Sequence, residues 1–172
     1  MKPRCAPSPM RLRRGFTLVE IMVVVVILGL LIAIAVPTYR RFQRKSQNTT
    51  FVNNLRLFTQ AFETYAMKYG TWPLTSDPTD PTKIIPVDAA GHSMSGEFRD
   101  SDWKAGALGG QWKWNFVGGG GHPKAYISIV GVNVDVSQMD EIAAIVNTGT
   151  TGTPSFQKTA DPPLTYSYTV QY

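Results

Sequence analysis

The sequence of 172 residues has one cysteine, Cys5, close to its N-terminus. A single cysteine cannot form an intramolecular disulfide, and it cannot build a thiolate metal site alone. The two histidines, His92 and His122, are 30 residues apart, and neither has a neighbour at the spacing of a zinc ligand. The sequence therefore predicts neither a disulfide framework nor a zinc centre.

Signatures of catalysis and of phosphate binding are also missing. The glycines of residues 118–121 lack the Lys-Ser/Thr pair of a phosphate loop and the spacing of a dinucleotide loop. The order of residues shows no Ser-His-Asp partnership. We therefore expect a protein that is not an enzyme and that needs no cofactor for a reaction.

Acidic residues are absent from the first 14 positions, which contain five Lys or Arg. Setting these five aside from the 17 Lys and Arg of the chain leaves 12 basic residues against 12 acidic ones. The net charge of +5 therefore belongs to the N-terminal leader. We predict no nucleic-acid binding, because the rest of the chain is formally neutral.

Polar side chains are missing from the stretch that follows the leader. From Phe16 to Val36 the only charged residue is Glu20, and residues 21–36 have no polar side chain. As a helix, this stretch would be roughly 31 Å long, close to the ~30 Å hydrocarbon core of a bilayer. The composition predicts a transmembrane helix, in which a carboxylate needs a partner.

Basic residues flank this apolar stretch on both sides. The five in the leader favour a cytoplasmic N-terminus, whereas Arg40, Arg41, Arg44 and Lys45 favour the opposite orientation. Charge alone therefore orients the helix weakly. We expect residues 40–45 to contact lipid headgroups.

The apolar stretch is preceded by Arg-Arg-Gly-Phe-Thr-Leu-Val-Glu at residues 13–20, and Pro37 follows it. Residues 11 to about 45 thereby resemble the N-terminal segment of type IV prepilins and type II secretion pseudopilins. The resemblance implies that a prepilin peptidase cuts between Gly15 and Phe16 and methylates the new amine of Phe16. It also implies that Glu20 pairs with the amine of a neighbouring subunit, since a buried acid needs a cation.

The resemblance further implies an α+β, pilin-like fold: a long N-terminal helix on a small antiparallel β-sheet head. We expect a cytoplasmic leader that is removed (1–15), a transmembrane or filament-core helix (16–37), its amphipathic continuation (38–70) and a β-rich periplasmic head (71–172). A helix that continues through Pro37 would be kinked or locally opened there.

The function that this implies is a subunit of a type II secretion pseudopilus in the bacterial inner membrane, with a single pass, a cytoplasmic leader and a periplasmic head. Its partners would be the prepilin peptidase and methyltransferase, homologous pilin or pseudopilin subunits, an inner-membrane assembly platform and the lipid bilayer. Many type IV pilins have a C-terminal disulfide loop, which a chain without cysteine after Cys5 cannot form.

Three other interpretations stay open. A surface type IV pilus subunit for adhesion, motility or DNA uptake would carry the same N-terminal segment. A secreted soluble binding protein would be cut after Ala35, at the small-x-small site of residues 33–35. A plain membrane anchor would leave Glu20 unexplained.

Beyond Pro37, apolar residues recur at steps of three and four and predict an amphipathic helix. Gly70 and Pro73 predict its end at about Tyr69. We therefore expect one helix from Phe16 to about Tyr69, whose second half packs on the head. The residues of the apolar face are Phe51, Leu55, Phe58, Phe62, Tyr65 and Tyr69.

The remaining residues, 71–172, suffice for one small core. Residues 71–96 are rich in Pro, Asp, Thr and Ser and predict a long surface loop. Alternation of apolar and polar residues predicts strands at 112–116, at 125–136 and at 164–172.

Within the second of these strands, the apolar alternation changes parity at Gly131, which predicts a bulge. Residues 137–147 predict a short helix that begins with a capping box of Ser137 and Asp140. One apolar face of this helix would contain Met139, Ile142, Ala143 and Val146. Together with the long helix, these elements predict the α+β arrangement.

Two sets of head residues suggest ligands. Major pseudopilins of type II secretion hold calcium in a C-terminal loop, so the resemblance implies a calcium site to which Asp100, Asp102 and Asp161 would supply oxygens. These acids do not match that site residue by residue, and solvated loop acids are the favoured interpretation. The four tryptophans would form either a sugar-binding face or part of the core, and the core is favoured.

Overall fold

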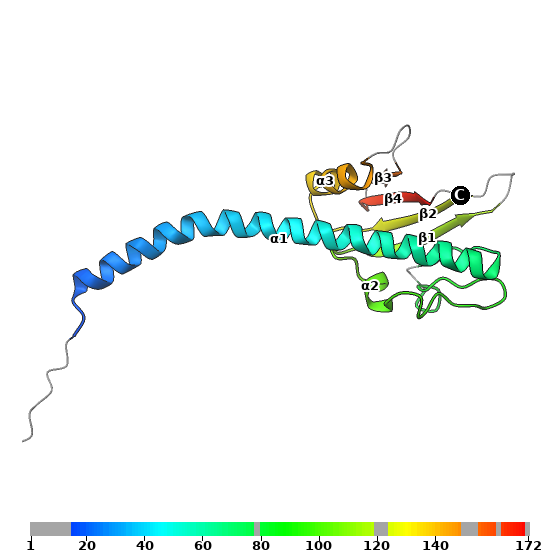
Figure 1. The fold of residues 1–172 in the computed structure, drawn as a ribbon, viewed down its shortest axis with the longest axis horizontal. Coiled ribbons are helices and arrows are strands. Elements are labelled where there is room, and N and C mark those ends of the chain that lie inside the picture. Colours follow the sequence, from blue (N-terminus) through cyan, green and yellow to red (C-terminus); the bar gives the residue numbers. More distant parts are fainter. Residues whose placement is uncertain (1–14, 78–79, 119–123, 149–154, 161–162, 171–172) are drawn as a thin grey trace, which may run out of the picture. The chain divides into compact units, whose positions relative to one another are not determined.

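The computed structural model describes residues 15–77, 80–118, 124–148, 155–160 and 163–170. It divides into two units at the junction of Phe42 and Gln43, and each is considered by itself. Its elements, shown in Figure 1, are α1 (Leu18–Tyr69), α2 (Asp100–Lys104), β1 (Gln111–Val117), β2 (Lys124–Val130), α3 (Val136–Val146), β3 (Phe156–Ala160) and β4 (Thr165–Val170). The fold is α+β and pilin-like, which confirms the predicted class.

The four strands form one antiparallel sheet in the order β1-β2-β4-β3. Trp112 lies opposite Ile129, which in turn lies opposite Tyr166, so these three side chains share one face of the sheet. All three are buried. This inner face packs against the second half of α1 (Figure 1).

The outer face of the sheet is polar and is linked from strand to strand by hydrogen bonds. The Asn115 side-chain amide on β1 donates to the Ser128 hydroxyl on β2 at 3.0 Å. The Ser128 and Ser167 hydroxyls are 2.9 Å apart, and those of Ser167 and Thr159 are 3.0 Å apart. These side chains form a row across all four strands, so this face contributes hydrogen bonds rather than apolar burial.

Aromatic rings fill the space between α1 and the sheet. The ring of Phe62 stacks on Trp114 with centroids 3.9 Å apart. Phe58 meets Trp103 and Trp112 edge-on, at 4.9 and 5.2 Å. Trp72, Trp103, Trp112 and Trp114 are all buried, which confirms that the tryptophans belong to the core.

The described residues of segment 71–96 form no named helix or strand and many are exposed, as predicted for a surface loop, but a few of them contribute to the core. Trp72 and Met94 are buried against α1 and the sheet. Ser76 lies along the outer edge of β1: its N–H donates to the Trp114 carbonyl at 2.9 Å, and its hydroxyl accepts from the Trp114 N–H at 2.8 Å. Thr75 accepts the Phe116 N–H at 3.0 Å in the same way. The polar composition of this segment predicted exposure to solvent, but these two hydroxyls accept hydrogen bonds from the edge strand β1.

Two predictions about the region between β2 and α3 were wrong. β2 ends at Val130 rather than near 136, because Gly131 has a φ of 73°, a left-handed conformation that ends the strand. α3 begins after Asp135, whose carboxylate accepts the Gln138 N–H at 2.7 Å. The cap is therefore Asp135 and not the predicted box of Ser137 and Asp140.

Candidate assembly site

The start of α1 is capped by Thr17. The hydroxyl of Thr17 accepts the backbone N–H of Glu20 at 3.2 Å, which is the third position of the helix, since α1 begins at Leu18. Ser or Thr followed three residues later by Glu is the pattern of a capping box. Thr17-Leu18-Val19-Glu20 has this capping-box pattern, but the sequence was interpreted only through its resemblance to prepilins.

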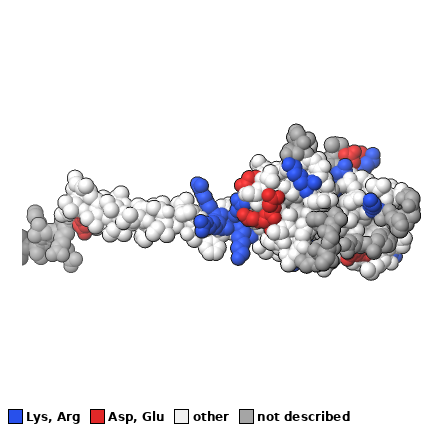
Figure 2. All heavy atoms as spheres, turned by 90° about the horizontal axis from the view of Figure 1, so that it is seen from above, with Lys and Arg blue, Asp and Glu red and all other residues white. Residues whose placement is uncertain are grey.

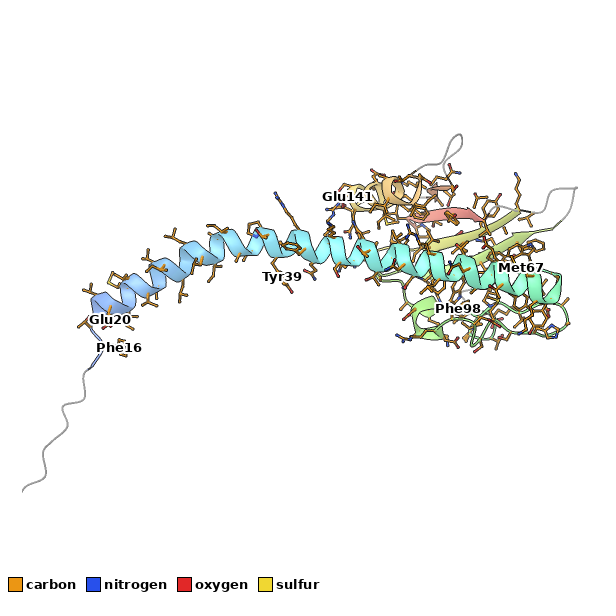
Figure 3. All side chains as sticks on the ribbon, in the orientation of Figure 1. Phe16, Glu20, Tyr39, Met67, Phe98 and Glu141 are labelled. Carbon is orange, nitrogen blue, oxygen red and sulfur yellow. The ribbon has the colours of Figure 1, made fainter. Side chains whose placement is uncertain are left out.

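Glu20 therefore occupies a position that suits a carboxylate before any assembly takes place. It lies in the first turn of α1, where the free backbone N–H groups and the helix dipole favour negative charge. Figure 3 shows Phe16 and Glu20 close together at this end of the helix. The same end of the helix thus contains the acid and the residue that resembles a prepilin cleavage site.

The apolar stretch after Glu20 has no burial within its own unit. All residues from 15 to 42 are exposed, and the side chains of Ile27 and Leu28 are 52% and 51% exposed. By length and composition, α1 contains one stretch that could cross a membrane. An apolar surface of this size in water calls for another molecule to cover it.

Gly15 and Pro37 bracket this stretch. A Cβ atom built on Gly15 would meet no atom within 4 Å, so the fold itself does not require glycine there. α1 continues through Pro37, and the Thr38 hydroxyl next to it donates to the Ile34 carbonyl at 3.1 Å. Proline removes one helical hydrogen bond, and such side-chain bonds help to satisfy the polar backbone nearby. A kink at Pro37 stays a prediction.

Arg44 connects α1 to the start of α3. Its guanidinium lies 3.3 Å from Asp135 and 3.0 Å from Glu141, and it donates to the Ser137 hydroxyl at 2.8 Å. The hydrogen bonds of Asp135 with Ser137 and Gln138, together with the charge of Arg44, lower the pKa of the Asp135 carboxyl. The sequence predicted that Arg44 contacts lipid, whereas in the structure its guanidinium binds side chains at the start of α3.

Behind this ion pair lies a buried pair of amides. The side chain of Gln138 donates to the Asn48 oxygen at 2.8 Å, and the Asn48 amide donates to Glu141 at 3.0 Å. Asn48 and Gln138 are only 4% and 6% exposed. These two hydrogen bonds hold α3 beside α1 at one specific position.

The far end of α1 is held by the loop at residues 88–92. The Asp88 carboxylate lies 2.8 Å from Nδ1 of His92 and accepts the backbone N–H groups of Ala90 and His92, each at 2.9 Å. The His92 ring stacks on Tyr69 at 4.3 Å. Burial alone would raise the pKa of Asp88, but the hydrogen bonds from His92 and Tyr65 outweigh it and lower the pKa to about 2. Sequence reasoning had found no ligand-spaced neighbour for His92.

Two of the three calcium candidates lie within the described residues. Asp100 and Asp102 lie in α2, where Asp100 accepts from the Ser95 hydroxyl at 3.2 Å and Asp102 from the Ser101 hydroxyl at 3.3 Å. Asp161 lies outside the described residues. In the described part of the chain, no three His, Cys, Asp or Glu residues are grouped to hold a metal ion. Calcium binding stays an untested prediction.

Known proteins match the N-terminal part of the chain. The family model described as the prokaryotic N-terminal methylation motif matches residues 10–36. The type IV major alpha-pilin of Moraxella bovis is 36% identical over 74 residues, which make up 43% of this chain and 46% of that protein. The N-terminal region of this chain is therefore similar to that of type IV prepilins.

Two further relatives of this pilin-like chain also match over only a short part of it. Fimbrial protein Q of Moraxella bovis is 48% identical over 46 residues, which cover 27% of this chain and 29% of that protein. The type IV major pilin protein PilA of Myxococcus xanthus is 49% identical over 43 residues, which cover 25% of this chain and 20% of that protein. The chain thus spans less than half the length of these relatives. No solved structure matches it.

Proposed function

We propose that this pilin-like chain is a filament subunit that is made as a membrane-anchored precursor. A prepilin peptidase cuts between Gly15 and Phe16 and methylates the Phe16 amine, and the apolar half of α1 then packs in a filament core. The observation that carries the proposal is the exposed apolar stretch that directly follows a matched methylation motif. An apolar helix with no partner in its own chain finds one first in lipid and then in other subunits.

Glu20 directs assembly in this mechanism. Before assembly, the carboxylate lies at the capped start of the helix, where the Thr17 cap and the helix dipole support it. Inside a filament it is removed from water, and desolvation then requires a positive partner. The amine of Phe16 on a neighbouring subunit supplies that charge and so fixes the stagger between adjacent helices.

The location and the partners follow from the same steps. The leader lies in the cytoplasm, α1 crosses the inner membrane once, and the β-sheet domain lies in the periplasm. The protein encounters the peptidase and methyltransferase, an inner-membrane assembly platform and homologous subunits. The five basic residues of the leader support this orientation.

The filament is a type II secretion pseudopilus. The chain has no cysteine after Cys5, whereas many type IV pilins close a C-terminal disulfide loop. A type IV surface pilus is the second candidate, favoured by relatives whose names are fimbrial protein and type IV major pilin. Deletion of the gene separates the two: loss of protein secretion supports the pseudopilus, and loss of surface filaments with intact secretion supports the pilus.

Mass spectrometry of the mature N-terminus tests the processing step. We expect an N-methylated Phe16, partial cleavage of Gly15→Ala and an uncut precursor for Gly15→Trp. Because a side chain at Gly15 meets no other atom of the fold, these effects report on the peptidase. A mature N-terminus at Val36 would instead support the secreted binding protein.

Three variants separate the charge of Glu20 from its place in the cap. Glu20→Val and Glu20→Gln should both be cleaved normally but enter filaments poorly when expressed beside the wild type. Thr17→Val removes the cap and keeps the charge, so it should assemble. Crosslinking and shear release measure incorporation, and normal incorporation of Glu20→Gln would refute the pairing of charges.

A further inference from the structure

A second group of α1 residues lies just beyond the apolar stretch. It consists of two aromatic and three basic residues, here called the basic collar: Tyr39, Arg40, Arg41, Phe42 and Lys45. All are exposed, Tyr39 and Phe42 at 69% and 67%. Figure 2 shows the basic side chains as a blue band at the end of a white, apolar segment of the helix. Figure 3 shows Tyr39 pointing away from the helix.

The cations of the basic collar differ from Arg44 in their partners. Arg44 is committed to Asp135 and Glu141. Across the described ranges, no ion pair involves Arg40, Arg41 or Lys45. Three cations within six positions repel one another unless an anionic surface lies near them.

The arrangement around the helix indicates what that surface is. Consecutive helical residues are about 100° apart, so the four residues Tyr39 to Phe42 point to all sides of α1. A single protein partner or a nucleic acid would contact one side of the helix. A bilayer surrounds a spanning helix completely and can satisfy all four directions.

The depth of the basic collar fits the same surface. At 1.5 Å per residue, Tyr39 and Phe42 lie roughly 5 and 9 Å beyond Val36, where the hydrocarbon core would end. The headgroup layer on each side of that core is about 5–8 Å thick, so Tyr39 lies within it and Phe42 just outside it. Tyrosine at this level and cations next to it are typical of membrane interfaces, and long Lys and Arg side chains can reach back to phosphates.

We propose that the basic collar binds the headgroups of anionic phospholipids in the leaflet that faces the β-sheet domain. This inference rests on the proposed function, because it requires that α1 spans a membrane. Cleavage after Gly15 would remove the five leader cations, which leaves the basic collar as the group that fixes the depth of the mature helix. Extraction of a subunit into a filament must then break these contacts, so anionic lipid opposes extraction.

The test uses the full chain reconstituted in vesicles of equal phosphatidylglycerol and phosphatidylcholine, each in turn supplied as a photo-crosslinking probe. Peptide mapping should find phosphatidylglycerol in excess on residues 39–45. The variant Arg40→Gln/Arg41→Gln/Lys45→Gln should reduce that excess at least ~fivefold, as should molar salt. The control Arg56→Gln/Arg99→Gln/Lys104→Gln removes three exposed cations elsewhere and should leave it unchanged.

The outcomes separate this inference from the proposed function. Carbonate extraction first establishes membrane insertion, and release of the chain into solution would refute the spanning helix itself. Insertion with equal labelling of residues 39–45 by the two lipids would refute the basic collar alone. So would loss of the label on adding a DNA oligonucleotide, since DNA would then be the partner. Labelling of the leader shows that the probe works in every sample.

Discussion

The two halves of α1 both contain large apolar residues, but these lie in opposite environments. In the first half, large apolar residues such as Leu28 are about half exposed. In the second half, Phe51 and Phe62 are completely buried against the sheet. The comparison shows that the second half stabilises the fold of this chain, whereas the first half contributes apolar surface that only other molecules can cover.

Truncation separates the two halves most strongly. A chain that begins at Arg44 keeps every buried residue of α1 and should melt cooperatively. A chain that begins at Gly70 loses five large buried apolar side chains, each worth about 1.5–3 kcal/mol, and their combined loss is comparable to the whole stability of about 5–15 kcal/mol that is typical of a protein. Those five are Phe51, Leu55, Phe58, Phe62 and Tyr65. Thermal denaturation of the two chains measures the difference. A cooperative transition of the chain that begins at Gly70 would show that α1 does not stabilise the β-sheet domain.

A matched pair of substitutions sharpens the comparison. Phe62→Ala removes the ring that stacks on Trp114 and should lower the free energy of unfolding by about 3–5 kcal/mol. Leu28→Ala in the exposed half should leave the unfolding of the β-sheet domain unchanged. Chemical denaturation of the two full-length variants in detergent measures both effects. Equal destabilisation would mean that the exposed half also supports the domain.

The buried amide pair tests a smaller contribution of the second half. Asn48→Ala leaves the buried Gln138 amide without its acceptor, so the free energy of unfolding should fall by about 1–3 kcal/mol. Asn53→Ala, on an exposed position of the same helix, is the control and should have little effect. Urea denaturation compares the two. Because alanine forms helix better than asparagine, propensity alone would not lower stability at either position, and an equal loss at Asn53 would show that the loss at Asn48 does not come from the buried pair.

The smallest expected effect concerns the end of the buried half and its dependence on pH. The pKa of Asp88 is lowered to about 2 from an ordinary value of 3.8. A lowered pKa in the folded state stabilises the fold above pH ~4, and this contribution disappears as the pH falls from ~4 to ~2. Asp88→Asn should therefore be less stable at neutral pH and should approach the wild type at pH 2. Parallel stability profiles over this range would show that the hydrogen-bonded Asp88 carboxylate does not cause the difference.

Much of the fold could be predicted because its signals are local and periodic. The apolar face of α1 repeats at helical spacing, and the strands of residues 112–116 and 164–172 alternate at a period of two; both signals led to the right elements. The surroundings of residues 71–96 could not be predicted in this way. Polar hydroxyls at Thr75 and Ser76 suit solvent and the edge of a strand equally well, and only the folded chain distinguishes the two.

The residues of the candidate site also differ in how local their signals are. Gly15, Phe16 and Glu20 lie within six positions of one another, so a short motif was enough to select them, and their roles stay predictions. The contacts of Arg44 with α3 join residues 91 and 97 positions apart, and no local pattern predicts them. The pair of Asp88 and His92 is four residues apart and could have been found from spacing, had the loop not been assigned to solvent.

The hydroxyls along β1 have a consequence for a crowded filament. An open strand edge pairs readily with the edge of another sheet, which is a route to irregular aggregates when many copies lie close together. Here Ser76 and Thr75 already occupy the N–H groups of Trp114 and Phe116 on that edge. Neighbouring copies therefore cannot extend the sheet through these groups. Along the β1 edge the sheet domain can therefore crowd against its copies without fusing to them, and at the opposite edge, β3, a shift in register between Lys158 and Ala160 interrupts the ladder.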